Sequence, residues 1–593
     1  MTATILAAAG AEGSQMLGLS TIDWAMIVLY FGFVLFIGWY LKRFTKTGEQ
    51  FFMAGRGMTA WIAGLAFIST NLGSQETMGY SSSTYQYGMV MNHAYWIGAI
   101  PAILFLSLVM MPFYHICKTH SVPGYLRLRF SESSRALAAI SFAFITILMS
   151  GINMFGMAKA MQTFLGWNLH YSIWISSLTV CFYVMAGGLL SAIFNEVLQF
   201  FLIWLGCLLI PVLGFIETGG WSGMVARITE NAAKYGMQGD YTHLWSVMTP
   251  EKNPVGMHWF AVIFGWGLAI SFGYWTTDFL VVQRVMSAKD VRSAQTGTII
   301  GGFFKMMVPL IVILPGLLAL AVLPYRLWPE NSPEAQAGAP TYNAVLPLMM
   351  KHYFGPGLLG LGVLSLIAGF MSGMAGNVSA FATVWTYDIY RPLIRPAIER
   401  RTRKHAGDAH YVSMGRWCTL LGVLISIGTA YLTLSFENIM TYAQFLFVIF
   451  VVPLFVPVIL GMLWKRTTAP AAFWSLLAGI LTAIGLFAYA YTHPTGLDMT
   501  KVNPDHVVRF TFSRLTGTIA TNVWTAWWTF LSALIVGLVV TAATRPKPES
   551  ELKDLVYGLT PIPSHEHLPL RKRPVFWAGV LFVAFVILNI IFW

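Results

Sequence analysis

Charged residues are scarce in this sequence of 593 amino acids. Asp, Glu, Lys and Arg together make up 10% of it, whereas soluble domains contain about 25%. Apolar residues make up 56% and aromatic residues 15%. This composition excludes a soluble globular enzyme and a disordered chain, and it predicts a polytopic membrane protein.

Cysteine is equally rare. The four cysteines lie in or beside apolar segments, and none of them forms a Cys-x-x-Cys pair. This spacing gives no reason to expect a disulfide framework or a zinc site. We interpret Cys117, Cys181, Cys207 and Cys418 as small buried hydrophobic residues.

Long hydrophilic stretches are missing as well. The longest segment between apolar runs is 217–257, and it is too short for a separate catalytic domain. The segments 388–415 and 544–574, which we expect in the interior, are too short for a signalling domain. No stretch resembles a nucleotide-binding P-loop, so an ATP-driven pump is not expected. Neither an HExxH motif nor a buried aspartate pair is evident, so we do not expect an intramembrane enzyme.

Apolar runs long enough to cross a membrane follow one another along the whole chain. A helix needs about 20 such residues to span the hydrocarbon core. We therefore expect an all-α polytopic membrane protein with about 14 transmembrane helices. The predicted spans are 22–40, 59–88, 94–115, 136–160, 169–187, 192–216, 258–282, 296–324, 357–386, 416–435, 439–463, 471–491, 519–543 and 575–593.

The basic residues indicate the orientation of the chain in the cell membrane. They lie between the apolar runs rather than on one continuous face, so the net charge of +12 does not predict a nucleic-acid interface. Most of the 36 Lys and Arg residues fall in alternate loops, which the positive-inside rule places in the cytoplasm. An even number of spans then puts both termini outside. Residues 1–20 lack the basic start of a signal peptide, and we expect them to form a short exported tail.

Two predicted spans carry polar runs at membrane depth, Ser69–Glu76 and Ser271–Asp278. They lie in the first helices of two five-helix blocks, 59–216 and 258–463. Matching interruptions in two halves are typical of a transporter binding site. The reason is that unwound backbone survives in a membrane only where it lines a cavity or holds a ligand. Close helix packing by small residues is the alternative, but it does not explain Asn71, Gln75 and Glu76.

Lys305 is a second anomaly, because it lies about ten residues into the span 296–324. A charged residue at the centre of a helix costs roughly 2.5–3.5 kcal/mol on insertion scales. We expect its partner to be Glu76 or a hydroxyl group of a ligand. The alternative is that the side chain snorkels to the inner headgroups, about 15 Å away along the helix.

Other polar residues in the apolar runs are weaker candidates. Gln444 is one of them, and Ser372 lies at mid-span, where a lone serine usually bonds to its own helix backbone. We expect Glu196, at the cytoplasmic edge of its span, to be solvated by water. We expect Asp278 to form an ion pair with Arg284 at the inner rim.

Several spaced motifs resemble those of one transporter family. Residues 274–289 read YWTTDFLVVQRVMSAK, similar to YW-x-TD…VQR-x-LSAK, and residues 122–130 read VPGYLRLRF, similar to P-x-YL-x-x-RF. Shorter matches lie at 187–199, 387–390 and 463–466. Together, over roughly residues 22–545, they resemble the solute:sodium symporter family, and its sodium/glucose cotransporter group in particular.

The resemblance implies a LeuT-type core of two inverted five-helix repeats, which would be 59–216 and 258–463. Residues 1–58 would hold the exported tail, a flanking helix and a cytoplasmic loop. Residues 217–257 would form an exterior loop, and 464–593 the C-terminal flanking helices. The implied mechanism is alternating access around a mid-membrane site, driven by inward sodium. A membrane potential adds about 2.3 kcal/mol per charge for each 100 mV.

The resemblance also implies a sodium site and a solute site. Sodium would bind the backbone carbonyls of Ser69, Leu72 and Gly369 and the hydroxyl of Ser372, whereas Gly373 stands where the family has a second hydroxyl. Glu76 replaces a neutral or imidazole group, and Tyr95 replaces a glutamate of the sugar transporters. The expected solute-binding residues are Asn71, Glu76, Tyr95, Ser271, Tyr274, Trp275, Lys305 and Gln444.

The resulting expectation is sodium-coupled symport of a small polar solute, such as a sugar or polyol. No cofactor beyond the coupling ion and no obligatory protein partner are expected. The alternative is a proton-coupled or uncoupled transporter that uses Glu76 as its titrating group, which the missing hydroxyl at Gly373 favours. A membrane sensor built on the same scaffold is a third and less favoured hypothesis.

Overall fold

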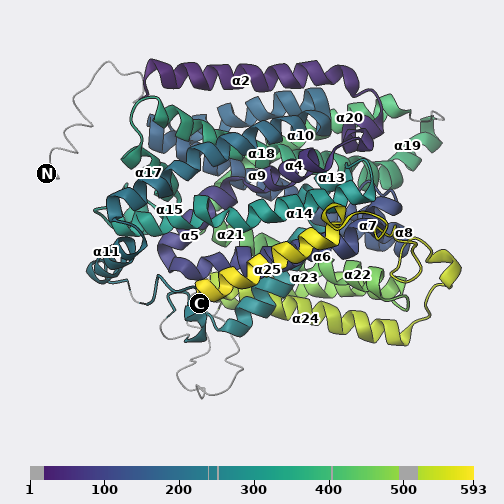
Figure 1. Cartoon of the computed structure of the whole chain (residues 1–593). Coiled ribbons are helices and arrows are strands. Elements are labelled where there is room, and N and C mark those ends of the chain that lie inside the picture. Colours follow the sequence, from purple (N-terminus) through teal and green to yellow (C-terminus); the bar gives the residue numbers. More distant parts are fainter. Residues whose placement is uncertain (1–18, 238, 250–252, 403–404, 406, 493–518) are drawn as a thin grey trace.

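The computed structural model describes residues 19–237, 239–249, 253–402, 405, 407–492 and 519–593. The exported tail predicted at the N-terminus lies almost entirely outside these residues. The regular secondary structure of the described chain is helical, with no strand and only two isolated bridges between loops. Figure 1 shows the long helices packed roughly side by side in one bundle. The all-α prediction is therefore confirmed for the described part.

Helices cover most of every predicted span. The first half contains α2 (Thr21–Leu41), α4 (Ala60–Asn71), α5 (Tyr80–Tyr87), α6 (Ile100–Phe105), α7 (Met111–Ile116), α8 (Val122–Arg129), α9 (Glu132–Leu165), α10 (Leu169–Thr218), α11 (Trp221–Lys234), α12 (Phe272–Thr277) and α13 (Phe279–Met286). The second half contains α14 (Val291–Met307), α15 (Pro309–Val322), α17 (Val345–Tyr353), α18 (Leu358–Val384), α19 (Arg395–Thr402), α20 (Asp408–Ala430), α21 (Ile439–Leu446), α22 (Val452–Leu463), α23 (Ala469–Thr492), α24 (Ile519–Ala543) and α25 (Pro574–Ile591).

Eleven helical segments of the described chain are long and apolar enough to cross a membrane. Two shorter apolar helices, Ala60–Asn71 and Leu169–Phe182, add to them. Some of the eleven join runs that the sequence separates, such as Gln75–Ile116. The molecule is therefore a multi-pass membrane protein, and the count of fourteen crossings stays a prediction.

Helix ends follow local sequence signals at the edges of the apolar runs. Ser131 caps α9 by accepting a hydrogen bond from the Ser134 amide, and Asn438 caps α21 in the same way. A cap of this kind is worth about 1 kcal/mol. Within α10, Gly188 adopts φ 57° and kinks the helix. A Cβ there would lie 2.6 Å from the Phe51 carbonyl oxygen, so only glycine fits. The kink separates the predicted spans 169–187 and 192–216.

The two predicted interruptions differ in the structure. In the first, α4 ends at Asn71, Leu72 and Gly73 are non-helical, and a wide π-helical turn over Gln75–Gly79 leads into α5. In the second, the prediction of an unwound Ser271–Asp278 is wrong except at its last residue.

The second helix stays wound through Thr277, and Asp278 alone takes extended backbone with ψ 109°. The hydroxyls of Thr276 and Thr277 explain the difference, because they donate to the carbonyls of Phe272 and Gly273 at 2.6 and 2.7 Å. Their polarity is thus satisfied within the helix. Asp278 instead caps α13 by accepting from the Leu280 amide at 2.9 Å.

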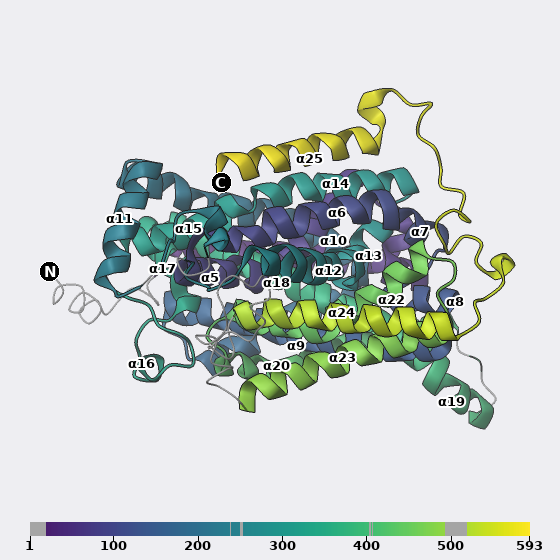
Figure 2. The same cartoon turned by 90° about the horizontal axis from the view of Figure 1, so that it is seen from below.

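The helices that carry polar residues lie inside the bundle. In the segment Leu358–Arg401, 83% of the apolar window is buried, against 22% for the first helix and 22% for Pro574–Ile591. Figures 1 and 2 show α2, α24 and α25 at the outside, with α18, α10 and α4 between them. The polar runs are therefore shielded from lipid by a layer of apolar helices.

Candidate functional site

A buried ion pair occupies the centre of the bundle. Lys305 of α14 donates to Glu76 Oε2 at 2.8 Å and to Asn71 Oδ1 at 2.6 Å. The side chains of Lys305 and Glu76 are 2% and 8% exposed. The predicted pairing is therefore confirmed, and the snorkelling alternative is wrong. Asn71 and Glu76 stand on either side of the break after α4, so the break places both next to one lysine.

Aromatic side chains complete the surroundings of this pair. Tyr95 donates its hydroxyl to Glu76 Oε2 at 2.7 Å, and the Lys305 Nζ lies 4.5 Å from the centre of the Tyr95 ring. Trp275 approaches the ammonium group at 5.0 Å from its ring centre. Asn71 Nδ2 donates to the Tyr274 hydroxyl at 2.9 Å. Cation–π contacts of this kind stabilise a desolvated ammonium group.

A small cavity of about 30 Å³ lies beside the ion pair, which is room for water but not for a sugar. Among its described lining residues, Glu76 and Lys305 are the charged ones, so the lining is neutral overall. Of the eight predicted solute residues, seven line the cavity, and Asn71 stands behind it bonded to Lys305 and Tyr274. The seven are Glu76, Tyr95, Ser271, Tyr274, Trp275, Lys305 and Gln444.

Several lining residues were not predicted as binding residues. They are Gln75, Tyr80, Ala94, Trp266, Ile270, Met440 and Phe447. Most are apolar or aromatic residues within apolar runs, where the sequence carries no signal that separates cavity wall from core. Gln75 is different, because it belongs to the polar run Ser69–Glu76 that marked the break.

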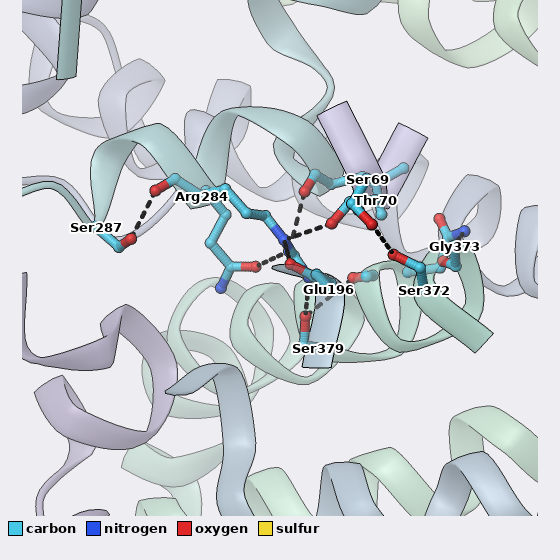
Figure 3. Close-up of polar contacts among 12 residues, drawn as sticks. Ser69, Thr70, Glu196, Arg284, Ser287, Ser372, Gly373 and Ser379 are labelled. Carbon is cyan, nitrogen blue, oxygen red and sulfur yellow. Dashed lines mark hydrogen bonds and ion pairs between the residues drawn. The ribbon is translucent and has the colours of Figure 1, made fainter. Parts of the chain in front are cut away.

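The residues implied for sodium also lie together, on the faces of α4 and α18 that meet. The hydroxyls of Ser69 and Ser372 are 3.2 Å apart, and both side chains are fully buried (Figure 3). A Cβ on Gly369 would lie 2.7 Å from the Leu72 carbonyl oxygen, so this oxygen approaches the α18 backbone closely. Carbonyls and hydroxyls at a helix break are the oxygen ligands that sodium takes in such folds.

At Gly373 the structure shows what stands near the missing hydroxyl. A Cβ on Gly373 would lie 2.8 Å from Asn153 Oδ1 and 3.0 Å from Gly73 Cα. Asn153 of α9 accepts from the Ser74 amide at 2.8 Å and donates to the Met149 carbonyl at 3.1 Å. The Asn153 carboxamide therefore fastens the chain just after the break to α9.

A second buried ion pair lies next to Ser69 and Ser372 and differs from the sequence expectation. Arg284 contacts both carboxylate oxygens of Glu196, at 2.5 and 3.2 Å, and both side chains are 0% exposed (Figure 3). The same guanidinium donates to the Thr70 hydroxyl at 3.1 Å. The prediction that water solvates Glu196 is therefore wrong, and so is the prediction that Arg284 pairs with Asp278. Glu196 begins an apolar run, and its neighbours in sequence give no hint that another helix covers it.

This geometry defines a class of protein. An all-helical membrane bundle with a helix broken beside a buried polar cavity is the arrangement of a secondary transporter rather than of an enzyme. The model of the sodium:solute symporter family matches residues 51–479, and the chain belongs to that family.

Its relatives include sodium/glucose cotransporter 4 of Danio rerio, which is 26% identical over 559 residues, covering 91% of this chain and 81% of the relative. Sodium/myo-inositol cotransporter 2 of Homo sapiens is 27% identical, with coverage of 79% and 70%. The sodium/glucose cotransporter of Vibrio parahaemolyticus is 25% identical, with coverage of 79% and 86%.

A solved structure with a similar fold is the substrate-bound outward-open state of a Na⁺-coupled sialic acid symporter. It matches with a TM-score of 0.67 at 18% identity, covering 89% of this chain and 99% of that one. The fold expectation of a LeuT-type core is confirmed by this likeness.

Proposed function

We propose that this protein couples the inward movement of sodium to the uptake of a neutral polyhydroxylated solute, a sugar or a cyclitol, by alternating access. The observation that carries the proposal is the neutral polar cavity formed around Glu76 and Lys305 beside the break in α4. Carboxylate, ammonium and amide groups together hydrogen-bond hydroxyls, and the aromatic wall suits the apolar face of a sugar ring. The glucose and myo-inositol cotransporters named above support this class of solute.

The break in α4 links the two sites. Ser69 and Leu72 face α18, where we place sodium together with Gly369 and Ser372. Glu76 of the same short stretch lines the solute cavity, and Asn71 lies behind it, bonded to Lys305 and Tyr274. An ion that fixes the backbone between Ser69 and Leu72 also fixes the two solute-binding side chains next to it. Binding of one species thereby favours binding of the other, which is the requirement for coupled transport.

We place the cytoplasm at the end of the bundle that carries α8, α19 and the loop 544–574. The basic loops meet there: Arg129 donates to the Trp464 carbonyl, and Arg292 to the Lys572 carbonyl, both at 3.1 Å. In Figure 1, the start of α2 and the end of α25 lie at the opposite end, near α11 and α17. The positive-inside rule supports this orientation.

A second candidate is proton coupling through Glu76, which the absence of a hydroxyl at Gly373 favours. The experiment uses purified protein in proteoliposomes. Uptake of labelled glucose and myo-inositol is measured with an inward gradient of sodium or of choline at equal pH, and then with a proton gradient without sodium. Accumulation only with sodium supports the proposal. Accumulation with the proton gradient alone, or with choline, contradicts sodium coupling.

A further inference from the structure

Two amide oxygens at the solute cavity have no hydrogen-bond partner. Gln75 Oε1 and Gln444 Oε1 are both buried, and both residues line the cavity. Buried polar atoms are normally paired with protein or with ordered water, so an unpaired acceptor beside a cavity indicates a place for a ligand donor. Gln75 and Gln444 come from different parts of the fold, the turn after the break and α21.

The donor groups of Lys305, Tyr95 and Asn71 in the same site already have acceptors within the protein. Lys305 donates to Asn71 and Glu76, and Tyr95 donates to Glu76. The Asn71 amide donates to the Tyr274 hydroxyl. The Tyr274 hydroxyl also lies beside the Gln75 side chain, and the Tyr80 hydroxyl beside the Gln444 side chain. These contacts orient both amides, with their oxygens left unpaired. Gln75 Oε1 and Gln444 Oε1 are thus buried acceptors at the cavity that no donor among the described residues reaches.

We infer that Gln75 is a specificity-determining residue of the solute site, and that Gln75 Oε1 accepts a hydrogen bond from a solute hydroxyl, beside Gln444, which the family resemblance already places in the site. The inference rests on the proposed function and narrows it to solutes that are rich in hydrogen-bond donors. A solute whose polar atoms are only acceptors, such as pyruvate or glycine betaine, leaves both oxygens unpaired and is rejected.

The experiment compares hydroxyl, deoxy and deoxyfluoro sugars on the purified wild-type protein in sodium. Affinity is measured by equilibrium binding of D-glucose and of its monodeoxy and monodeoxyfluoro derivatives. Because fluorine cannot donate, replacing a hydroxyl that donates to Gln75 by fluorine should weaken binding about tenfold, as much as removing the hydroxyl does. Fluoro derivatives that all bind as tightly as glucose would overturn the inference.

The variant Gln75→Met keeps the length of the side chain and removes the acceptor. We expect it to weaken glucose binding about tenfold and to abolish the penalty of one deoxyfluoro derivative. Gln162→Met, at an exposed position of α9, is the matched control and should change neither. If Gln75→Met does not fold, an analogue series on the wild type in which no fluorinated position shows a penalty still overturns the inference.

The outcomes separate this inference from the proposed function. Unchanged glucose affinity in Gln75→Met overturns the inference and leaves sodium-coupled polyol transport standing. Binding of glycine betaine or pyruvate, without binding of glucose or myo-inositol, overturns both. Binding of glucose with the expected loss at one fluorinated position supports both.

Discussion

At the scale of single residues, the protein is organised around two ion pairs buried in a bundle that otherwise contains few charges. Burying an ion pair is no guarantee of stability, because desolvation offsets the attraction. Removing one partner is a different matter, since the other charge is then left without compensation. Glu76–Lys305 and Glu196–Arg284 are both buried pairs. Replacing one partner of either pair should therefore destabilise the protein much more than replacing both.

The Glu76–Lys305 pair gives the first prediction. Glu76→Gln and Lys305→Gln should each destabilise the folded protein by about 3–5 kcal/mol, and the double variant should recover much of that loss. The measurement is thermal unfolding of the three variants in detergent, with solute uptake alongside. The exposed pair Lys465–Glu549, with side chains 62% and 60% exposed, is the control, and its cycle should show little coupling. Strictly additive effects at Glu76 and Lys305 would contradict the prediction.

Ser372 and Gly373 give the second prediction. Ser372→Ala removes the hydroxyl opposite Ser69 and should raise the sodium concentration for half-maximal uptake several-fold, while solute affinity at saturating sodium changes less. Gly373→Ala should be worse for folding, because its Cβ would press against Asn153 Oδ1 and Gly73. Sodium titrations of uptake, with folded yield measured in parallel, check both. An unaltered sodium dependence in Ser372→Ala would remove this serine from the cation site.

A residue of the site can be predicted from the sequence when its polarity differs clearly from that of the neighbouring residues. Lys305 and Glu76 were predictable as partners because charges inside apolar runs need an explanation. The pairing of Glu196 with Arg284 was not predictable, because both residues stand at the ends of apolar runs. A charged residue there is normally exposed to water, and the sequence does not show that another helix buries it. Thr276 and Thr277 contributed to the prediction of an interrupted helix, but their hydroxyls donate to backbone carbonyls of the same helix, which stays wound.

At the scale of helices, the break after α4 is the element on which both sites depend, and α9 holds it in place. Asn153 Oδ1 accepts a hydrogen bond from the Ser74 amide, and it lies where a Cβ on Gly73 or Gly373 would clash with it. This role was absent from the predictions, because Asn153 is one polar residue in a long apolar helix. The position of the break therefore depends on a helix that carries none of the predicted binding residues.

The third prediction concerns α12. Tyr274 lies one turn before the extended residue Asp278, is bonded to Asn71, and its ring contacts that of Phe447 at a tilt of 52°. We expect Tyr274 to close the cavity on the cytoplasmic side, so Tyr274→Ala should reduce solute accumulation more than solute binding. Binding and accumulation are measured on the same proteoliposome preparation, with Tyr274→Phe as the variant that keeps the ring. Equal losses of binding and accumulation would point to a contact role instead.

At the scale of the whole molecule, Glu196 and Arg284 join the two predicted repeats. Glu196 belongs to α10, in the first block, and Arg284 to α13, in the second, while Thr70 of α4 is a third partner.

The fourth prediction concerns Glu196→Gln, which leaves Arg284 buried without a counter-charge. We expect it to lower the free energy of unfolding by about 3–5 kcal/mol and therefore to lower the yield of folded protein strongly. Fluorescence-detected size exclusion of Glu196→Gln, compared with Glu196→Asp, checks this. A normal yield of Glu196→Gln would show that water reaches Arg284.

The volume of the cavity beside Glu76 and Lys305 has a thermodynamic consequence. A sugar cannot enter about 30 Å³, so the sugar binding that we propose requires a wider form of the same protein. The observed dissociation constant is then the intrinsic one divided by the fraction of molecules in the wider form. If that fraction is about 1%, the observed affinity is about a hundredfold weaker than the contacts alone would give. An ion that prefers the wider form raises this fraction, and so it strengthens solute binding without touching the solute.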